Sequence, residues 1–211
     1  MGDSPTALRQ QILHWLAKNV PAKRVEHILR VEQFSSVLAA QHQLDPGKAA
    51  QAGLMHDLAK YFKPHVLLEM AHQEGLSLDP VDELNPHLLH ADVSAIVARD
   101  RFGITDSQIL AAIANHTLGH PDMDDLSCVV FLADSLEPGR GDRAELIQLR
   151  HLSQQDLHQA VWLTSDYTLN HLMETQRLIH PRALATRNAF LHRAKSKQAQ
   201  TSEAIQPSSQ R

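Results

Sequence analysis

The sequence predicts an all-α protein, and three observations lead to this prediction. Apolar residues recur at intervals of three and four along most of the 211-residue chain, which is the period of an α-helix. Proline and helix-capping residues stand where such stretches begin. No stretch shows convincing alternation of a β-strand; residues 126–132 come nearest, but the residues on either side favour a helix.

The expected helices follow from this spacing in chain order. Residues 5–19 repeat apolar side chains every fourth place, and residues 22–43 repeat them at three and four. Asp45-Pro46 predicts the start of a helix that runs to about residue 62, and Pro64 restarts a short one. Further helices are expected at residues 87–101, 105–116, 125–136, 153–179 and 181–192, with loops at residues 74–86 and 117–124.

Length and composition suit one domain followed by a tail. Hydrophobic residues make up 43% and charged residues 21%, which is ordinary for a globular chain. We expect a single helical domain over residues 1–193. Residues 194–211 are polar and poor in apolar side chains, a composition typical of a disordered tail.

Charge and cysteine content narrow the class of protein. A net charge of −4 and a pI near 6.4 argue against a general nucleic-acid or membrane-surface binder. Cys128 is the single cysteine, so no internal disulfide forms, which fits a reducing compartment. The first twenty residues lack a secretory pattern, and no apolar stretch approaches the ~20 residues of a membrane span. We expect a cytoplasmic monomer or homodimer.

The strongest local signal is the adjacent pair His56-Asp57. The pair interrupts the apolar segment Gly53-Leu-Met-His56-Asp57-Leu-Ala-Lys60, where an unpaired buried carboxylate would be very costly. A metal ion is one partner that resolves this cost, with the histidine as a second ligand. At helical spacing, Lys60 shares the face of the pair and is placed to hold an anionic substrate there.

Four other polar residues also stand where the helical pattern predicts burial. His27 falls on the stripe of Val31 and Phe34, and His90 on that of Val93 and Val97. His116 ends the stripe of residues 109 and 113, and Asp134 is a lone carboxylate in an apolar helix. Six such residues on five helices are hard to satisfy one by one, whereas around metal they satisfy one another.

Each of these residues also has an ordinary structural interpretation. A histidine taken alone is more often a hydrogen-bonded core residue, and Asp134 could pair with Arg140. Lys60 and Arg24 could extend from the surface rather than bind phosphate. Thr117 could be a helix-end hydroxyl and Gly119 a turn residue.

The combined pattern resembles a known family. The order His, His-Asp, His, His, Asp resembles the HD-domain superfamily of metal-dependent phosphohydrolases, whose fold is a helical bundle. Within it, the chain is similar to the bacterial symmetrical diadenosine-tetraphosphate hydrolases over roughly residues 8–192. The segments that carry this likeness are Arg24-Val-Glu-His27, His56-Asp57-Leu-Ala-Lys60, His90-Ala-Asp, His116-Thr-Leu-Gly119 and Ala133-Asp134-Ser-Leu-Glu-Pro-Gly-Arg140.

The resemblance implies a binuclear metal site. One metal would be held by His27, His56, Asp57 and Asp134. The second would be held by His90 and His116, with Asp57 bridging the two ions. The metals implied are iron, with manganese or cobalt as substitutes.

The resemblance also implies a substrate and a reaction. Metal-activated water would cleave diadenosine tetraphosphate symmetrically into two molecules of ADP, with Asp57 and Lys60 as catalytic residues. The expected substrate contacts come from Arg24, Lys60, Thr117, Gly119 and Arg140. The alternatives are an HD-type nucleotidase or phosphodiesterase acting on another nucleotide, a di-iron oxygenase, and a non-catalytic nucleotide sensor.

Overall fold

The computed structural model describes residues 5–205, and its backbone over that range is helical with no β-strand, which confirms the all-α prediction. The α-helices are α1 (Pro5–Asn19), α2 (Ala22–Gln41), α3 (Pro46–Met55), α4 (Pro64–Glu74), α5 (Pro80–Leu84), α6 (His90–Phe102), α7 (Ser107–Asn115), α8 (Asp125–Leu136), α9 (Ala144–Ser153), α10 (Leu157–Glu174) and α11 (Pro181–Ile205). Two 3₁₀ turns, η1 (Pro86–Leu89) and η2 (Pro138–Arg140), complete the described elements.

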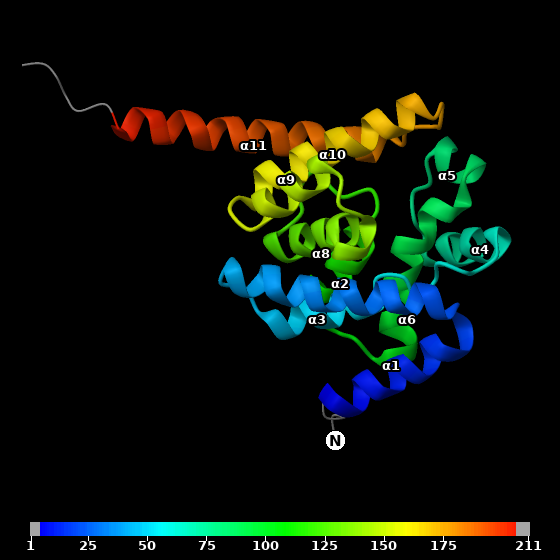
Figure 1. The fold of residues 1–211 in the computed structure, drawn as a ribbon. Helices are drawn as coiled ribbons and strands as arrows, with labels where there is room; N and C mark the ends of the chain where they lie inside the picture. Colours follow the sequence, from blue (N-terminus) through cyan, green and yellow to red (C-terminus); the bar gives the residue numbers. More distant parts are fainter. Residues whose placement is uncertain (1–4, 206–211) are drawn as a thin grey trace, which may run out of the picture.

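The helices surround α8, which lies near the middle of the bundle (Figure 1). Helix α2 packs along α3, and both contact α8. Helix α8 also contacts α7 and α10, and α10 packs along α11 on the opposite side of the bundle from α1. The α8 side chains from Leu126 to Ala133 are all buried, as expected for a helix that is apolar on every side. This central helix therefore carries Asp134 to the edge of the interior, where its side chain lines a cavity.

Capping residues set the starts of several helices. The Asp45 side chain accepts hydrogen bonds from the backbone N–H groups of Gly47 and Lys48 at the start of α3. The Asp106 side chain does the same for α7. These carboxylates satisfy N–H groups that have no partner inside the helix. No described helix is both long and apolar enough to cross a membrane.

Helix α5 lies inside the segment that we predicted to be a loop, residues 74–86. Asp79 caps it through a reciprocal capping box with Asp82, and Pro80 occupies the first turn. The Asp and Pro residues that indicate a turn are also the residues that start a helix. Helix α9 was not predicted either, because only a narrow apolar face, with Leu146 and Leu149 buried, marks it.

The predicted disorder from residue 194 also differs from the structure. Helix α11 continues to Ile205, and Ala194 is buried one turn after the fully buried Phe190. Lys197 then forms an ion pair with Asp156 at 2.8 Å. A helix that is already nucleated extends at little cost through residues of good helical propensity. The remaining part of the predicted tail, residues 206–211, lies outside the described residues.

Gly53 allows α2 and α3 to approach closely. A Cβ atom at this position would lie 2.9 Å from Ser35 Oγ and 3.1 Å from both the Glu32 Cα and the Val31 carbonyl oxygen. Two of these three neighbours belong to the backbone of α2 and move only if the helix moves. The Gly53 carbonyl also accepts a hydrogen bond from His56 Nδ1 at 2.7 Å, so this close packing positions the HD pair.

We expect Gly53→Ala to destabilise the protein. Overpacking costs about 1–3 kcal/mol, and it outweighs the gain of about 1 kcal/mol in helical propensity. The melting temperature should fall by about 2–6 °C in a domain of this size. Gly47→Ala is the matched control, because its Cβ would meet only the Asp45 carboxylate. Equal melting temperatures for both variants in a calorimetric scan would contradict the packing argument.

Candidate metal centre

The six polar residues singled out in the sequence come together in the interior. His27 comes from α2, the pair His56-Asp57 directly follows α3, and His90 opens α6. His116 directly follows α7, and Asp134 lies in the last turn of α8. The exposed fractions of the four histidines and Asp57 are all at or below 5%. Their role as metal ligands stays a prediction, but their convergence in space is a property of the structure.

The HD pair lies outside any helix, which differs from the prediction of a helix continuing to residue 62. Helix α3 ends at Met55, and the next residues form successive turns with hydrogen bonds from Leu58 N–H to Met55 and from Lys60 N–H to Asp57. Tighter turns in this place aim the two adjacent side chains at one centre. On a regular helix, adjacent side chains diverge and do not face the same point.

One half of the cluster surrounds Asp57 Oδ1. His90 Nε2 lies 3.3 Å from this oxygen and His116 Nε2 lies 3.8 Å from it. The two histidine nitrogens are 3.1 Å apart. Asp57 is fully buried and also lies beside His56, whose Nε2 is 3.3 Å from Asp57 Oδ2. Asp57 therefore stands between the two halves of the cluster.

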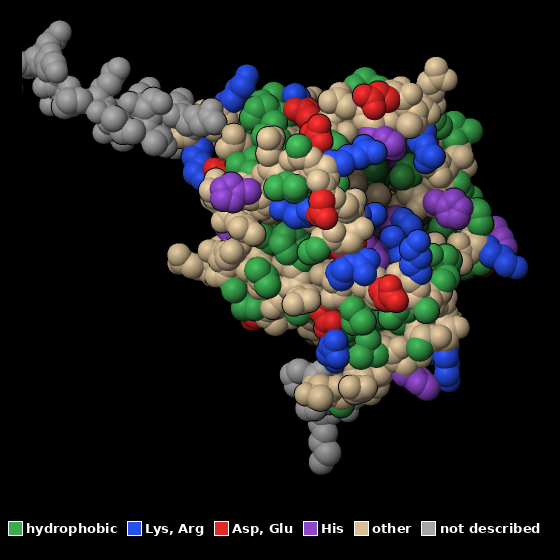
Figure 2. Space-filling view, in the orientation of Figure 1, with side chains coloured by type: hydrophobic (Ala, Val, Ile, Leu, Met, Phe, Trp, Pro, Cys, Tyr) green, Lys and Arg blue, Asp and Glu red, His purple; other side chains and the backbone are tan. Residues whose placement is uncertain are grey.

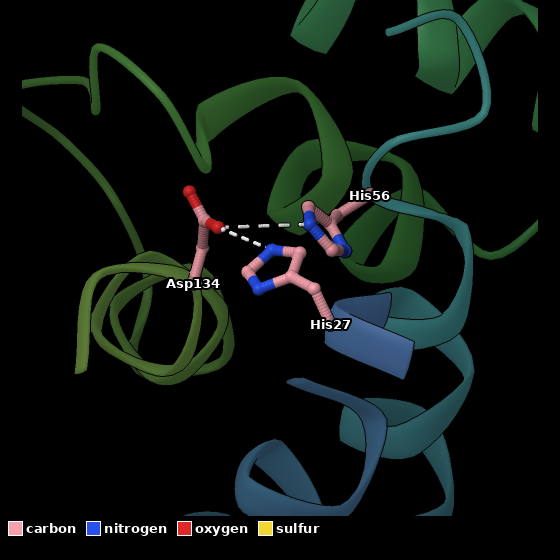
Figure 3. Close-up of side chains that lie close together, drawn as sticks. All are labelled: His27, His56 and Asp134. Atoms are coloured by element: carbon pink, nitrogen blue, oxygen red, sulfur yellow. Dashed lines mark hydrogen bonds and ion pairs between the residues drawn. The ribbon is translucent and has the colours of Figure 1, made fainter. Parts of the chain in front are cut away.

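The other half surrounds Asp134 Oδ1. His27 Nε2 lies 3.0 Å from this oxygen and His56 Nε2 lies 3.7 Å from it. Figure 3 shows the two rings and the carboxylate pointing toward one another from three separate elements. The potential ligand atoms of His27, His56 and Asp134 lie within 4.8 Å of one another, and so do those of His56, Asp57 and His116.

The hydrogen bonds that the histidines make through Nδ1 leave Nε2 as the nitrogen that faces the aspartates. Nδ1 of His56, His90 and His116 each lies within 2.8 Å of a backbone carbonyl three residues earlier. A carbonyl can only accept, so each Nδ1 donates. His27 Nδ1 faces Glu137 Oε1 at 2.9 Å. In a neutral ring, Nε2 then carries a lone pair, and all four Nε2 atoms face the two aspartates. Metal-binding histidines are commonly oriented in this way.

The nitrogen and oxygen atoms of the cluster fit a metal ion. His56 Nε2 and Asp57 Oδ1 are buried and have no hydrogen-bond partner, and buried polar atoms rarely remain so. His90 and His116 direct two lone-pair nitrogens at each other, an arrangement that a cation relieves. Imidazole nitrogens together with carboxylate oxygens suit divalent transition metals.

The pKa shifts show how strongly the groups interact. Burial alone would raise the pKa of Asp57, but the neighbouring His56, His90 and Arg24 outweigh it and hold the pKa well below its usual value. Asp134 behaves similarly, with His27 and Arg140 opposing burial and leaving its pKa well below normal. Burial lowers the pKa of His116 well below its usual value, and the nearby histidines add to this. Asp57 and Asp134 are therefore anionic, and His116 is neutral, near pH 7.

Three cationic side chains lie against the cluster, as the sequence suggested. Arg24 forms an ion pair with Asp57, and Arg140 donates to Asp134 Oδ1 at 2.6 Å. Lys60 Nζ lies 3.1 Å from His90 Nε2, and burial lowers the pKa of Lys60 even though the Asp57 charge opposes it. All three also line an adjoining cavity. Local positive charge therefore exists within a chain that is acidic as a whole.

The cavity opens from this cluster and has a volume of about 610 Å³. Figure 2 shows a hollow in one face of the molecule, with basic and histidine side chains around it. Thr117 lines the cavity, and its hydroxyl lies 3.2 Å from His90 Nε2. Gly119 does not line it. A Cβ on Gly119 would lie 2.5 Å from Thr186 of α11, so its visible role is packing, and direct substrate contact there stays a prediction.

Glu137 is a functional candidate that the sequence reasoning did not single out. It is 1% exposed, and its carboxylate holds His27 Nδ1, Arg30 and the Gly139 N–H. A Cβ on Gly139 would meet the Arg30 guanidinium at 2.5 Å, so glycine makes room for this arginine. The sequence feature that could have indicated this residue is a carboxylate directly before a proline at the end of an apolar helix.

The family model for the HD domain matches residues 24–139, more than half of the chain. This range contains all six clustered residues together with Arg24, Lys60 and Glu137. Helices α9, α10 and α11, including the part of the cavity wall on α10 and α11, lie outside the match.

Curated relatives and a solved structure agree with that match. Proteins named symmetrical bis(5'-nucleosyl)-tetraphosphatase from Halalkalibacterium halodurans and Bacillus subtilis are 31% and 30% identical, covering 87% and 85% of this chain and 97% and 96% of theirs. A probable nicotinate-nucleotide adenylyltransferase/Ap4A hydrolase of Mycoplasma genitalium is 35% identical over 72% of this chain, which spans 44% of that longer protein.

The solved structure is a predicted HD superfamily hydrolase involved in NAD metabolism from Clostridium acetobutylicum. It is 33% identical, with a TM-score of 0.83 over 87% of this chain and 97% of its own. The family match contains all six clustered residues, and the relatives and this structure cover most of the chain. The chain therefore belongs to the HD-domain superfamily of hydrolases.

Proposed function

We propose that this protein hydrolyses diadenosine tetraphosphate, and related dinucleoside polyphosphates, symmetrically into two nucleoside diphosphates. The observation that carries the proposal is the placement of the cluster. Its two aspartates and four histidines lie beside a cavity of about 610 Å³ that Arg24, Lys60 and Arg140 also line. Such a volume is in the range of nucleotide-sized ligand sites, and the relatives named as symmetrical tetraphosphatases support this substrate.

In the proposed reaction, one group of residues holds the metal ions and another binds the phosphates. Two metal ions, proposed to be iron, would be held by the six clustered residues and would supply an activated water and positive charge. Phosphoryl transfer depends mainly on positioning and on neutralising charge. Lys60 and Arg24 would donate to phosphate oxygens next to Asp57, and Arg140 would do so beside Asp134. Thr117 adds a hydroxyl donor at the same wall of the cavity.

Product analysis tests the proposal directly. The protein is reconstituted with iron, or in parallel with manganese or cobalt, and its metal content is measured. It is then incubated with diadenosine tetraphosphate, and the products are separated by anion-exchange chromatography. We expect ADP as the sole product, formed in a two-to-one ratio to the substrate consumed.

Other outcomes contradict the proposal in distinct ways. If the products are AMP and ATP, the protein is a hydrolase, but it does not cleave the substrate symmetrically. Metal-loaded protein that leaves diadenosine tetraphosphate intact, yet hydrolyses a nucleoside monophosphate or a cyclic nucleotide, would establish the alternative nucleotidase or phosphodiesterase. Binding of nucleotide without turnover of any of these compounds would establish a sensor.

A further inference from the structure

The far wall of the cavity is formed by the segment between α10 and α11. We call residues 175–180 the rim segment. Arg177, Leu178 and His180 of this segment line the same cavity as Arg24 and Lys60. The rim segment lies beyond residue 139, where the HD-domain match ends. The family match therefore gives it no role.

Arg177 differs from the other basic residues of the cavity. Arg24 and Arg140 form ion pairs with aspartates, and Lys60 lies against His90. Over residues 5–205, Arg177 is seen to make one hydrogen bond, from its backbone N–H to Leu172 O at 2.9 Å, and none from its guanidinium. An exposed guanidinium on a cavity wall, without a carboxylate partner, is available to an anionic ligand.

The rim segment is held in a defined conformation. Gln176 has a φ of 53°, which turns the chain back sharply after α10. His180 is buried, and its Nε2 lies 3.1 Å from Asp82 Oδ2 of α5. His180 Nδ1 accepts a hydrogen bond from the Arg182 N–H, so Nε2 carries the proton and donates to Asp82. The segment is thus pinned to α5 at its far end, which lowers the entropy cost of using it to bind a ligand.

Leu178 adds an apolar surface beside the free guanidinium. It lines the cavity and yet is 54% exposed, and Leu169 and Leu172 continue the apolar wall along α10. A nucleotide matches both features of this wall. Its flat base can lie against the leucine side chains, and its phosphate can pair with the guanidinium. The wall therefore fits one nucleotide half of an elongated substrate whose middle lies at the metal cluster.

We propose that Arg177 and Leu178 bind the outer nucleotide of the dinucleoside tetraphosphate. This inference rests on the proposed function. Arg177 pairs with a phosphate remote from the bond that is cleaved, and Leu178 covers the attached nucleoside. Both are proposed as binding residues, with no part in the bond-breaking step.

The test compares three variants under steady-state conditions with diadenosine tetraphosphate and the metal-loaded protein. Arg177→Gln should raise KM about tenfold, the loss expected for one charge-assisted hydrogen bond, and should change kcat much less. Arg177→Lys should recover part of the affinity because it keeps the charge. Arg101→Gln is the matched control, because Arg101 is also exposed but does not line the cavity. Its KM should equal that of the unaltered protein.

The results separate this inference from the proposed function. If the unaltered protein forms ADP and Arg177→Gln has the same KM, the rim contact is wrong and the function stands. A fall in kcat with constant KM would also overturn it, because this indicates a disturbed active site. If the unaltered protein forms no ADP from diadenosine tetraphosphate, the proposed function fails, and the inference that rests on it fails too.

Discussion

Asp57→Asn is expected to lower kcat/KM for diadenosine tetraphosphate by more than about a hundredfold, beyond the loss typical of a residue that only supports a ligand. The amide keeps the shape of the side chain but removes the negative charge. Asp57 is fully buried and touches three of the four clustered histidines as well as Arg24. Its loss should therefore affect both halves of the metal site.

The measurement combines kinetics with elemental analysis. Bound metal per chain should fall with kcat/KM, while circular dichroism shows that the variant remains folded. Asp166→Asn serves as the control, because Asp166 forms a partly exposed ion pair with Arg187 and does not contact the cluster. Full metal content with unchanged kcat/KM in Asp57→Asn would refute the assignment of this residue.

The second large effect is expected at Glu137. Glu137→Gln should reduce activity or metal affinity by about 10- to 100-fold, as for other residues that orient a metal-binding histidine. The carboxylate now accepts hydrogen bonds from His27, Arg30 and the Gly139 backbone. An amide has one accepting oxygen, so its NH₂ group must face at least one of these donors. Arg30 Nε and the Gly139 N–H both donate to Oε2, whereas His27 Nδ1 faces Oε1. The amide oxygen is therefore expected on the Oε2 side, where it keeps two donors, and the NH₂ group toward His27, whose ring then loses its fixed orientation.

Two comparisons separate this role from a general effect on the fold. Glu145→Gln makes the same chemical change on an exposed residue of α9 and should leave activity unaltered. His27→Ala combined with Glu137→Gln should lose little more than His27→Ala alone, because both changes act through one ring. Additive losses in the double variant would show that Glu137 acts by another route.

Much of the site can be predicted from the sequence, because its polar residues stand at positions where the helical pattern predicts buried apolar side chains. His27, His90, His116 and Asp134 each interrupt an apolar helical pattern, and a buried polar group needs a partner. That argument finds the members of the cluster one at a time. It does not find Glu137, whose side-chain partners Arg30 and His27 lie 107 and 110 positions away along the chain.

The elements that the sequence analysis placed wrongly have local causes. Helix α5 starts from Asp79 and Pro80, residues that indicate either a loop or a helix start until the following turn is seen. The HD pair leaves α3 because it is turned toward distant groups, and no local periodicity records this. Most of the rim segment was predicted to continue the helix of residues 153–179, whereas α10 ends at Glu174.

The origin of the six clustered residues has a thermodynamic consequence. They come from five separate stretches between His27 and Asp134, and only the packed bundle brings them together. An unfolded chain cannot present the same set, so any cation that they bind favours the native state over the unfolded state. Unfolding and cation release are thus linked equilibria. The conformational stability of the domain becomes a function of free cation concentration, even though most of the buried side chains are apolar.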